Sequence, residues 1–116
     1  QLTHDDDRFK DEDYFIKNVD AGLLLGGATY RWLLAAIRST DVLNAAGFAE
    51  DIKQPVLVFQ ADEDMIVDNA AMTKLVQRMP RGQLVVVPRA KHELYKETDA
   101  VRAQLYAHIL PFIADL

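Results

Sequence analysis

The chain has 116 residues, 50% of them hydrophobic, and it carries a formal net charge of −5. That length suits one domain or part of one, and the excess of acids argues against non-specific binding to nucleic acid. The absence of cysteine excludes disulfides and cysteine-ligated metals, and no apolar run approaches the roughly 20 residues that span a membrane.

The first half of the chain predicts helices and no strand. Residues 1–10 are polar and predict a loop, and residues 11–19 predict a short helix with one apolar side. Residues 29–45 have apolar side chains near helical spacing and predict the first long helix, with Gly47 near its end. The chain starts without an initiator methionine, a cap or an apolar pattern, so we expect it to be the interior of a longer protein, with removal of a tag or propeptide as the alternative.

The second half alternates strands with helices. Residues 56–60 and 84–87 are apolar runs with almost no polar alternation, which is typical of strands buried on both faces of a parallel sheet. Residues 69–79, capped by Asp68, predict the helix between them, and residues 99–116 predict an amphipathic final helix. This order predicts an α/β fold with a parallel crossover, and two strands make an incomplete sheet.

Polar loops follow both predicted strands. Asp62, Glu63 and Asp64 come after the first strand, and His92 comes after the second. Because functional groups gather at the carboxyl ends of strands in open α/β sheets, we expect an acid and the histidine to meet there. Such a pair fixes the imidazole tautomer that the base of a nucleophile requires, although an acid and a histidine also meet in such loops by chance. Asp68 is explained as a helix cap, Glu63 is expected to point to solvent, and spacing does not separate Asp62 from Asp64.

The stretches "PVLVFQADEDMIVDN" and "LVVVPRAKHEL" resemble the closing third of an α/β-hydrolase of the monoacylglycerol lipase and lysophospholipase group. The upstream stretches "LTHDDDRFKDEDYFIKN" and "GGATYRWLLAAI" resemble the bacterial inner-membrane lysophospholipases within that group. This resemblance covers nearly all of the chain. It implies the C-terminal part of an α/β-hydrolase fold, with two parallel strands, flanking helices and part of the cap. It implies no cofactor and no metal.

The resemblance also assigns roles to single residues. The family acid stands in a D-x-x-V/I-D pattern, which matches Asp64 to Asp68 and makes Asp64 the acid of a catalytic triad. The family histidine precedes a glutamate, as His92 precedes Glu93. Relatives usually have glycine in place of Arg89, so the loop backbone before His92 is expected to differ.

The nucleophile of these enzymes stands on a G-x-S-x-G turn. The only serine here is Ser39, which lies inside a predicted helix without flanking glycines and does not fit that role. The family order of serine, aspartate and histidine places the nucleophile upstream, so we expect this chain alone to be inactive. Pro111 falls in a helix that usually runs on in relatives, and we expect it to kink or shorten that helix.

The resemblance divides the chain into two segments. Residues 1–50 are expected to be a cap or lid segment, and residues 51–116 the C-terminal hydrolase segment with the triad acid and histidine. Tyr30 and Trp32 begin an amphipathic helix of the cap segment, where core packing is the default interpretation. The resemblance makes these two residues candidates for substrate binding along an acyl-chain channel.

The function implied is a serine hydrolase that cleaves carboxylic esters of lysophospholipids or monoacylglycerols. The expected partners are a lipid with one acyl chain and a peripheral membrane surface, and the expected location is the cytoplasm or the inner face of the cytoplasmic membrane. The chain is also expected to self-associate or to pair with the missing N-terminal portion. An alternative from another class is a non-catalytic binding domain, flavodoxin-like or receiver-like, with an acidic pocket at the strand ends.

Two other histidines have simpler interpretations. The run from His4 to Asp7 is expected to be a solvated loop, because consecutive acids cannot all converge on one ion. His108 lies near the apolar side of the last predicted helix and is expected to be packed and half-buried. Neither interpretation gives these histidines a chemical role.

Overall fold

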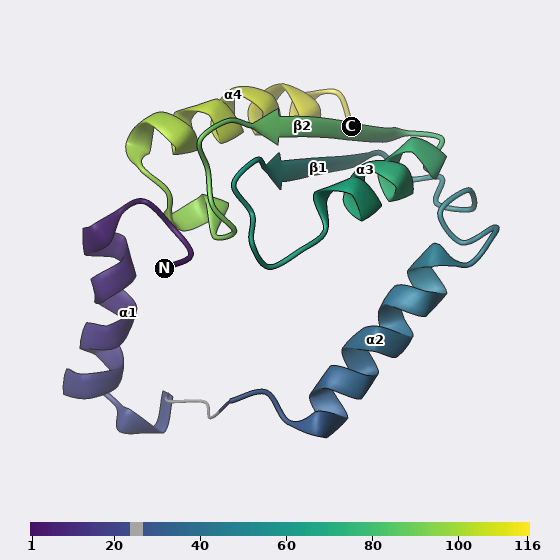
Figure 1. Cartoon of the computed structure of the whole chain (residues 1–116). Helices are drawn as coiled ribbons and strands as arrows, with labels where there is room; N and C mark the ends of the chain where they lie inside the picture. Colours follow the sequence, from purple (N-terminus) through teal and green to yellow (C-terminus); the bar gives the residue numbers. More distant parts are fainter. Residues whose placement is uncertain (24–26) are drawn as a thin grey trace.

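The computed structural model describes residues 1–23 and 27–116 and contains a small parallel sheet with helices around it (Figure 1). In chain order the elements are α1 (Asp6–Asn18), the 3₁₀ turn η1 (Ala21–Leu23), α2 (Tyr30–Asn44), β1 (Val56–Ala61), α3 (Asn69–Arg78), β2 (Gly82–Val87), the 3₁₀ turn η2 (Leu94–Lys96) and α4 (Asp99–Ala114). β1 and β2 pair in parallel, with Val56 opposite Gly82 and Ala61 opposite Val87. The predicted α/β arrangement is confirmed.

Different helices cover the two faces of the sheet. One face packs against α4, and the core that they share consists of Ala61, Val87, Ala90, Val101 and Leu105. On the other face, the Gln60 side chain accepts a hydrogen bond at 3.0 Å from the hydroxyl of Thr73 in α3. Because successive strand residues point to opposite faces, Ala61 and Gln60 place α4 and α3 on opposite sides of the sheet (Figure 1).

The first helix is longer than its apolar pattern predicted. α1 begins at Asp6, because Asp5 accepts a hydrogen bond from the backbone N–H of Arg8 at 3.0 Å and so caps the helix. Asp6 and Asp7 in the first turn also suit the positive end of a helix dipole. The predicted loop is therefore wrong for residues 6–10. At the other end of the chain, α4 continues through Pro111 and ends within one turn of it.

α1 and α2 extend away from the sheet (Figure 1). The radius of gyration is 16.7 Å, against roughly 13 Å for a compact domain of this length. α2 has no buried residue, and its large exposed apolar side chains are Tyr30, Trp32, Leu33, Leu34, Ile37 and Val42. Its C-terminal end is tied to α3, because the guanidinium of Arg78 donates to the carbonyl of Asn44 at 3.1 Å and to the carboxylate of Glu50 at 2.8 Å.

Candidate functional site

The three acids considered after β1 have three different partners. Asp62 accepts a hydrogen bond from the backbone N–H of Ala90 at 3.2 Å. Asp68 caps α3 by accepting two backbone N–H bonds at 2.8 and 3.1 Å, as the sequence predicted. Asp64 is the acid that contacts His92. The structure thus separates Asp62 from Asp64, which spacing alone had left open.

The Asp64–His92 pair lies at the carboxyl ends of both strands. Asp64 Oδ2 is 2.9 Å from His92 Nδ1, and Asp64 Oδ1 accepts hydrogen bonds from the backbone N–H groups of Ile66 and Val67 at 2.8 and 3.2 Å. The Asp64 side chain is 4% exposed and the imidazole 36%. Because an ionised carboxylate only accepts, His92 donates from Nδ1, and Nε2 is left as the nitrogen that can take up a proton.

The surroundings of Asp64 keep it ionised. Burial is the largest influence on its pKa and acts to raise it, because a charge is poorly solvated away from water. The hydrogen bonds from Ile66, His92 and Val67 act in the opposite direction and together outweigh burial, so the pKa of Asp64 lies below its ordinary value of 3.8. At neutral pH the site therefore presents a fixed negative charge to one side of the imidazole.

The two loops that carry the pair are joined through their backbones. The N–H of Asp62 donates to the carbonyl of Val87 at 3.2 Å, and the N–H of Glu63 donates to the carbonyl of Ala90 at 3.0 Å. Hydrogen bonds from the N–H groups of Arg89 and Ala90 hold the pKa of Asp62 below its ordinary value. Asp62 therefore contacts the main chain of the histidine loop, whereas Asp64 contacts the imidazole itself.

Arg89 has an unusual backbone conformation three residues before His92. Its φ is 55°, in the left-handed region that glycine adopts freely and that costs other residues free energy. Among the described residues, Arg89 is the only residue other than glycine with a positive φ. The loop backbone at this position is thus one that suits the glycine expected from relatives, although the side chain is arginine.

Replacing Arg89 by glycine should therefore relieve strain in the histidine loop. We expect Arg89→Gly to be more stable to unfolding than Arg89→Ala by about 1 kcal/mol, because alanine keeps the left-handed strain while both variants lose the same side chain. Urea denaturation of both variants measures the difference. Equal stabilities would contradict a strained backbone at this position.

The sequence did not identify His4 and Glu97, which lie beside the pair. His4 Nδ1 is 2.9 Å from Glu97 Oε1, and His4 Nε2 is 3.2 Å from Glu63 Oε2. Residues 4–7 are mostly exposed, as predicted, but residues 6 and 7 are helical and not part of a loop. Glu63 has a partner rather than pointing only to solvent. Asp5 at a cap position could have predicted the start of α1, but no local pattern links His4 with Glu97, which stands 93 positions later.

The structure does not bring the aromatic residues of α2 to the pair. Tyr30 is 93% exposed and Trp32 is 62% exposed, at the end of α2 that lies away from the strands (Figure 1). Ser39 is also exposed on α2, and Gly26 of the "GGATYRW" stretch lies outside the described residues. A substrate-binding role for Tyr30 and Trp32 stays a prediction.

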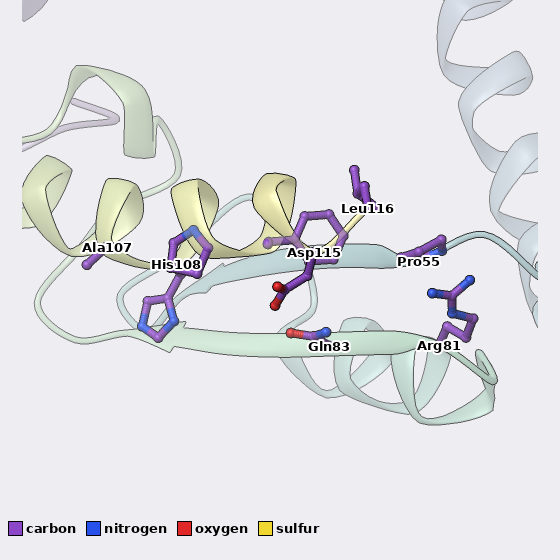
Figure 2. A pocket seen from close by; sticks show the side chains of 9 residues that line it. Pro55, Arg81, Gln83, Ala107, His108, Asp115 and Leu116 are labelled. Atoms are coloured by element: carbon purple, nitrogen blue, oxygen red, sulfur yellow. The ribbon is translucent and has the colours of Figure 1, made fainter.

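A separate pocket of about 260 Å³ lies between the sheet and the second half of α4, with Pro55 and Arg81 near the starts of the strands at one end and His108 at the other (Figure 2). Its polar lining includes Arg81, Gln83, His108 and Asp115. His108 packs with its ring edge-on to that of Phe59 at 6.3 Å between centroids, but it is exposed, so the predicted half-burial is wrong. The residues that line this pocket include none from the loops that carry the Asp64–His92 pair.

Sequence relatives of the chain include two bacterial proteins. The probable lysophospholipase L2 of Haemophilus influenzae is 31% identical over 98 residues, which cover 84% of this chain and 31% of that protein. Lysophospholipase L2 of Escherichia coli K12 is 30% identical over 119 aligned positions, which cover 96% of this chain and 34% of that protein. The chain thus spans about a third of the length of these curated relatives.

Fold and family comparisons agree with each other. The structure resembles the crystal structure of a soluble variant of monoglyceride lipase from Saccharomyces cerevisiae in complex with a substrate analogue, with a TM-score of 0.66 and 21% identity. The likeness covers 98% of this chain and 40% of that one, and it shows an α/β-hydrolase fold in part. The family model described as serine aminopeptidase, S33, matches residues 4–99. The chain therefore belongs to the serine aminopeptidase S33 family of α/β-hydrolases.

Proposed function

We propose that Asp64 and His92 are the acid and the base of a Ser-His-Asp triad, in a hydrolase that cleaves carboxylic esters of lipids with one acyl chain. The observation that carries the proposal is the 2.9 Å contact between His92 Nδ1 and the almost completely buried carboxylate of Asp64. The nucleophilic serine would come from sequence upstream of this chain. Ser39, exposed on α2, does not supply it, so the chain by itself should not turn over substrate.

Each residue of the pair has a defined task in this mechanism. Asp64 holds His92 in the tautomer with the proton on Nδ1, so that Nε2 can take the proton of the serine hydroxyl as its oxygen attacks the ester carbonyl. His92 then gives that proton to the leaving alcohol, which leaves an acyl-serine. Water attacks the acyl-serine, with Nε2 again taking and returning the proton, and the free fatty acid leaves. Asp64 stabilises the imidazolium that forms in each half of the reaction.

The acids after β1 do not favour a cation-binding or phosphoryl-accepting domain. Such a domain would need the strand-end carboxylates to converge on one ion or to leave one of them free. Asp62 instead contacts a backbone N–H, Asp64 contacts His92, and Asp68 caps α3. The distribution of partners supports a triad at this edge of the sheet.

The substrate class can be tested with three compounds. Two relatives are lysophospholipases by name, and a structural neighbour is a monoglyceride lipase, whereas the family description is an aminopeptidase. We expect the protein that joins this chain to its nucleophile to cleave a long-chain lysophospholipid or monoacylglycerol much faster than a short peptide amide. Comparing kcat/KM for the three decides this, and faster cleavage of the amide would show that the ester assignment is wrong.

We further propose that residues 1–50 form a cap segment over the site. We also propose that the protein works at a membrane surface, and that it is located in the cytoplasm or on the inner face of the cytoplasmic membrane. The apolar side chains exposed on α2, Trp32 and Leu33 among them, support a surface that meets lipid. Among the described helices, none has the length and apolar character needed to cross a bilayer. Binding to vesicles in a flotation assay tests the membrane contact.

The unpaired strand edges support self-association of this chain. The described residues form a two-stranded sheet, so β1 and β2 each have one edge without a partner strand. Such edges are templates for pairing with another chain, unless further sequence of the same protein completes the sheet. We expect light scattering of the chain alone to give a mass above 13.1 kDa. A monodisperse monomer would contradict this expectation.

A further inference from the structure

Glu97 is a buried carboxylate that the proposed reaction does not use. It is 0% exposed, and its Oε1 accepts hydrogen bonds from the backbone N–H groups of Lys91 and His4 at 3.0 and 3.1 Å. Its Oε2 accepts from the N–H of Thr98 at 3.2 Å. Burying a carboxylate is costly unless its oxygens are hydrogen-bonded, and one of the bonds that offset this cost comes from the backbone N–H of Lys91, the residue before His92.

His4 connects Glu97 with the other loop of the site. Its Nδ1 lies 2.9 Å from Glu97 Oε1, and its Nε2 lies 3.2 Å from Oε2 of Glu63, the residue before Asp64. Carboxylates only accept hydrogen bonds, so the ring donates at both contacts when it is an imidazolium. The His4 side chain therefore contacts Glu63 in the Asp64 loop and also Glu97, whose carboxylate accepts a hydrogen bond from the His92 loop.

The segment that carries His4 is itself fixed beside the histidine loop. The hydroxyl of Thr3, which is 0% exposed, donates to the carbonyl of Lys96 at 2.8 Å and accepts from the N–H of Asp5 at 3.1 Å. The carbonyl of Leu2 accepts from the N–H of Glu93 at 2.9 Å. These bonds hold His4 in place from both sides along the chain.

Together these contacts fix the main chain around His92. The N–H of Ala90 is held by Asp62, that of Lys91 by Glu97, and that of Glu93 by the carbonyl of Leu2. We propose that the contacts from Glu63 to His4 and from His4 to Glu97 position the Asp64 and His92 loops relative to each other. We call this chain of contacts the brace, and His4 and Glu97 are the residues that hold it together. Both are positioning residues and do not touch substrate. The effect on catalysis rests on the proposed function, whereas the effect on the geometry of the pair does not.

Two variants of His4 separate the two contacts of the brace. In His4→Asn the side-chain nitrogen stands near the position of Nδ1 and keeps the contact with Glu97, whereas in His4→Gln it stands near Nε2 and keeps the contact with Glu63. The readout is the NMR signal of the proton on His92 Nδ1 in the full 116-residue chain. We expect both variants to raise the exchange rate of this proton with water about tenfold or more, because each opens the brace at one end.

The control is His108→Asn, which makes the same chemical change at an exposed histidine on α4 outside the brace. Glu63→Ala removes the other end of the brace through a side chain that is 49% exposed, so it tests the proposal even where a His4 variant fails to fold. We expect Glu63→Ala to raise the exchange rate as His4→Asn does. Exchange rates of His4→Asn and Glu63→Ala within twofold of the His108→Asn rate would overturn the proposal.

A kinetic measurement links the brace to the proposed reaction. In the protein that joins this chain to its nucleophile, we expect Glu63→Ala and His4→Asn to lower kcat while KM stays within about twofold of its original value, because positioning residues act on the pair and not on substrate binding. A change in KM alone would overturn a positioning role. The absence of ester hydrolysis in the unmodified protein would instead refute the proposed function and leave the exchange measurement valid.

Discussion

Replacing Asp64 by asparagine should lower the turnover number about 10⁴-fold, because loss of the carboxylate allows the wrong imidazole tautomer. The amide of asparagine can donate to His92 Nδ1, and the ring would then carry its proton on Nε2. Nε2 would then have no free lone pair and could not take the proton of the serine hydroxyl. The measurement is kcat for a long-chain ester in the protein that joins this chain to its nucleophile. The binding of substrate should change little, because Asp64 is 4% exposed and its oxygens are already occupied.

The matched control is Asp62→Asn, an identical change two positions away. Asp62 accepts hydrogen bonds from the backbone N–H groups of Arg89 and Ala90, and the oxygen of an asparagine can still accept from Ala90. We therefore expect a loss of less than about tenfold, which corresponds to the weakening of one hydrogen bond to a charged group. If Asp62→Asn lowered kcat more than Asp64→Asn, the assignment of the triad acid would be wrong.

The strands and their order were predictable because they follow from local sequence patterns. Residues 56–60 and 84–87 are apolar almost without alternation, so a parallel sheet was the simplest arrangement. The predicted burial of both faces is wrong for the second strand, because Val86 is 53% exposed. The start of α1 was missed because the prediction relied on apolar periodicity, and residues 6–10 contain one large apolar side chain, Phe9. The capping side chain of Asp5, rather than burial, sets that helix start.

The candidate pair was predictable in part. Topology alone indicated that an acid after β1 and His92 after β2 would share one edge, and the family pattern then favoured Asp64. The contact of His4 with Glu97 was not predictable from periodicity or spacing, since it joins two ends of the chain through side chains and not through paired elements. The exposure of α2 was also unexpected, because an amphipathic pattern predicts which side is apolar but not what covers it.

Acid should destabilise the fold through Glu97. Burial is the largest influence on the pKa of Glu97 and raises it, but the hydrogen bonds from the Lys91 N–H and from His4 outweigh it, so the pKa lies below its ordinary value of 4.5. A carboxyl group whose pKa is lower in the folded state stabilises the fold fully above its unfolded pKa, and this contribution is lost as the pH falls through the folded pKa. For Glu97 the loss therefore begins near pH 4.5 and continues below it.

Replacing Glu97 by glutamine should remove this pH dependence. At neutral pH we expect Glu97→Gln to lower the free energy of unfolding by about 2 kcal/mol, because hydrogen bonds to a charged acceptor become bonds to a neutral one. As the pH falls below 4.5, Glu97 itself becomes neutral, so the difference between the two proteins should shrink. Urea denaturation at neutral pH and in steps down to about pH 3 measures both free energies.

Glu93→Gln is the control for this series, because Glu93 lies next to His92 and contacts Lys96 at 3.4 Å through an i,i+3 ion pair. Ion pairs near the surface contribute about 0.2–1 kcal/mol, so the control should stay close to the unmodified protein at every pH. Glu50, whose pKa is lowered to about 2 by its hydrogen bond with Arg78, titrates identically in all three proteins and cancels from the differences. A Glu97→Gln difference that is the same at neutral pH and in acid would mean that the charge of Glu97 does not stabilise the fold.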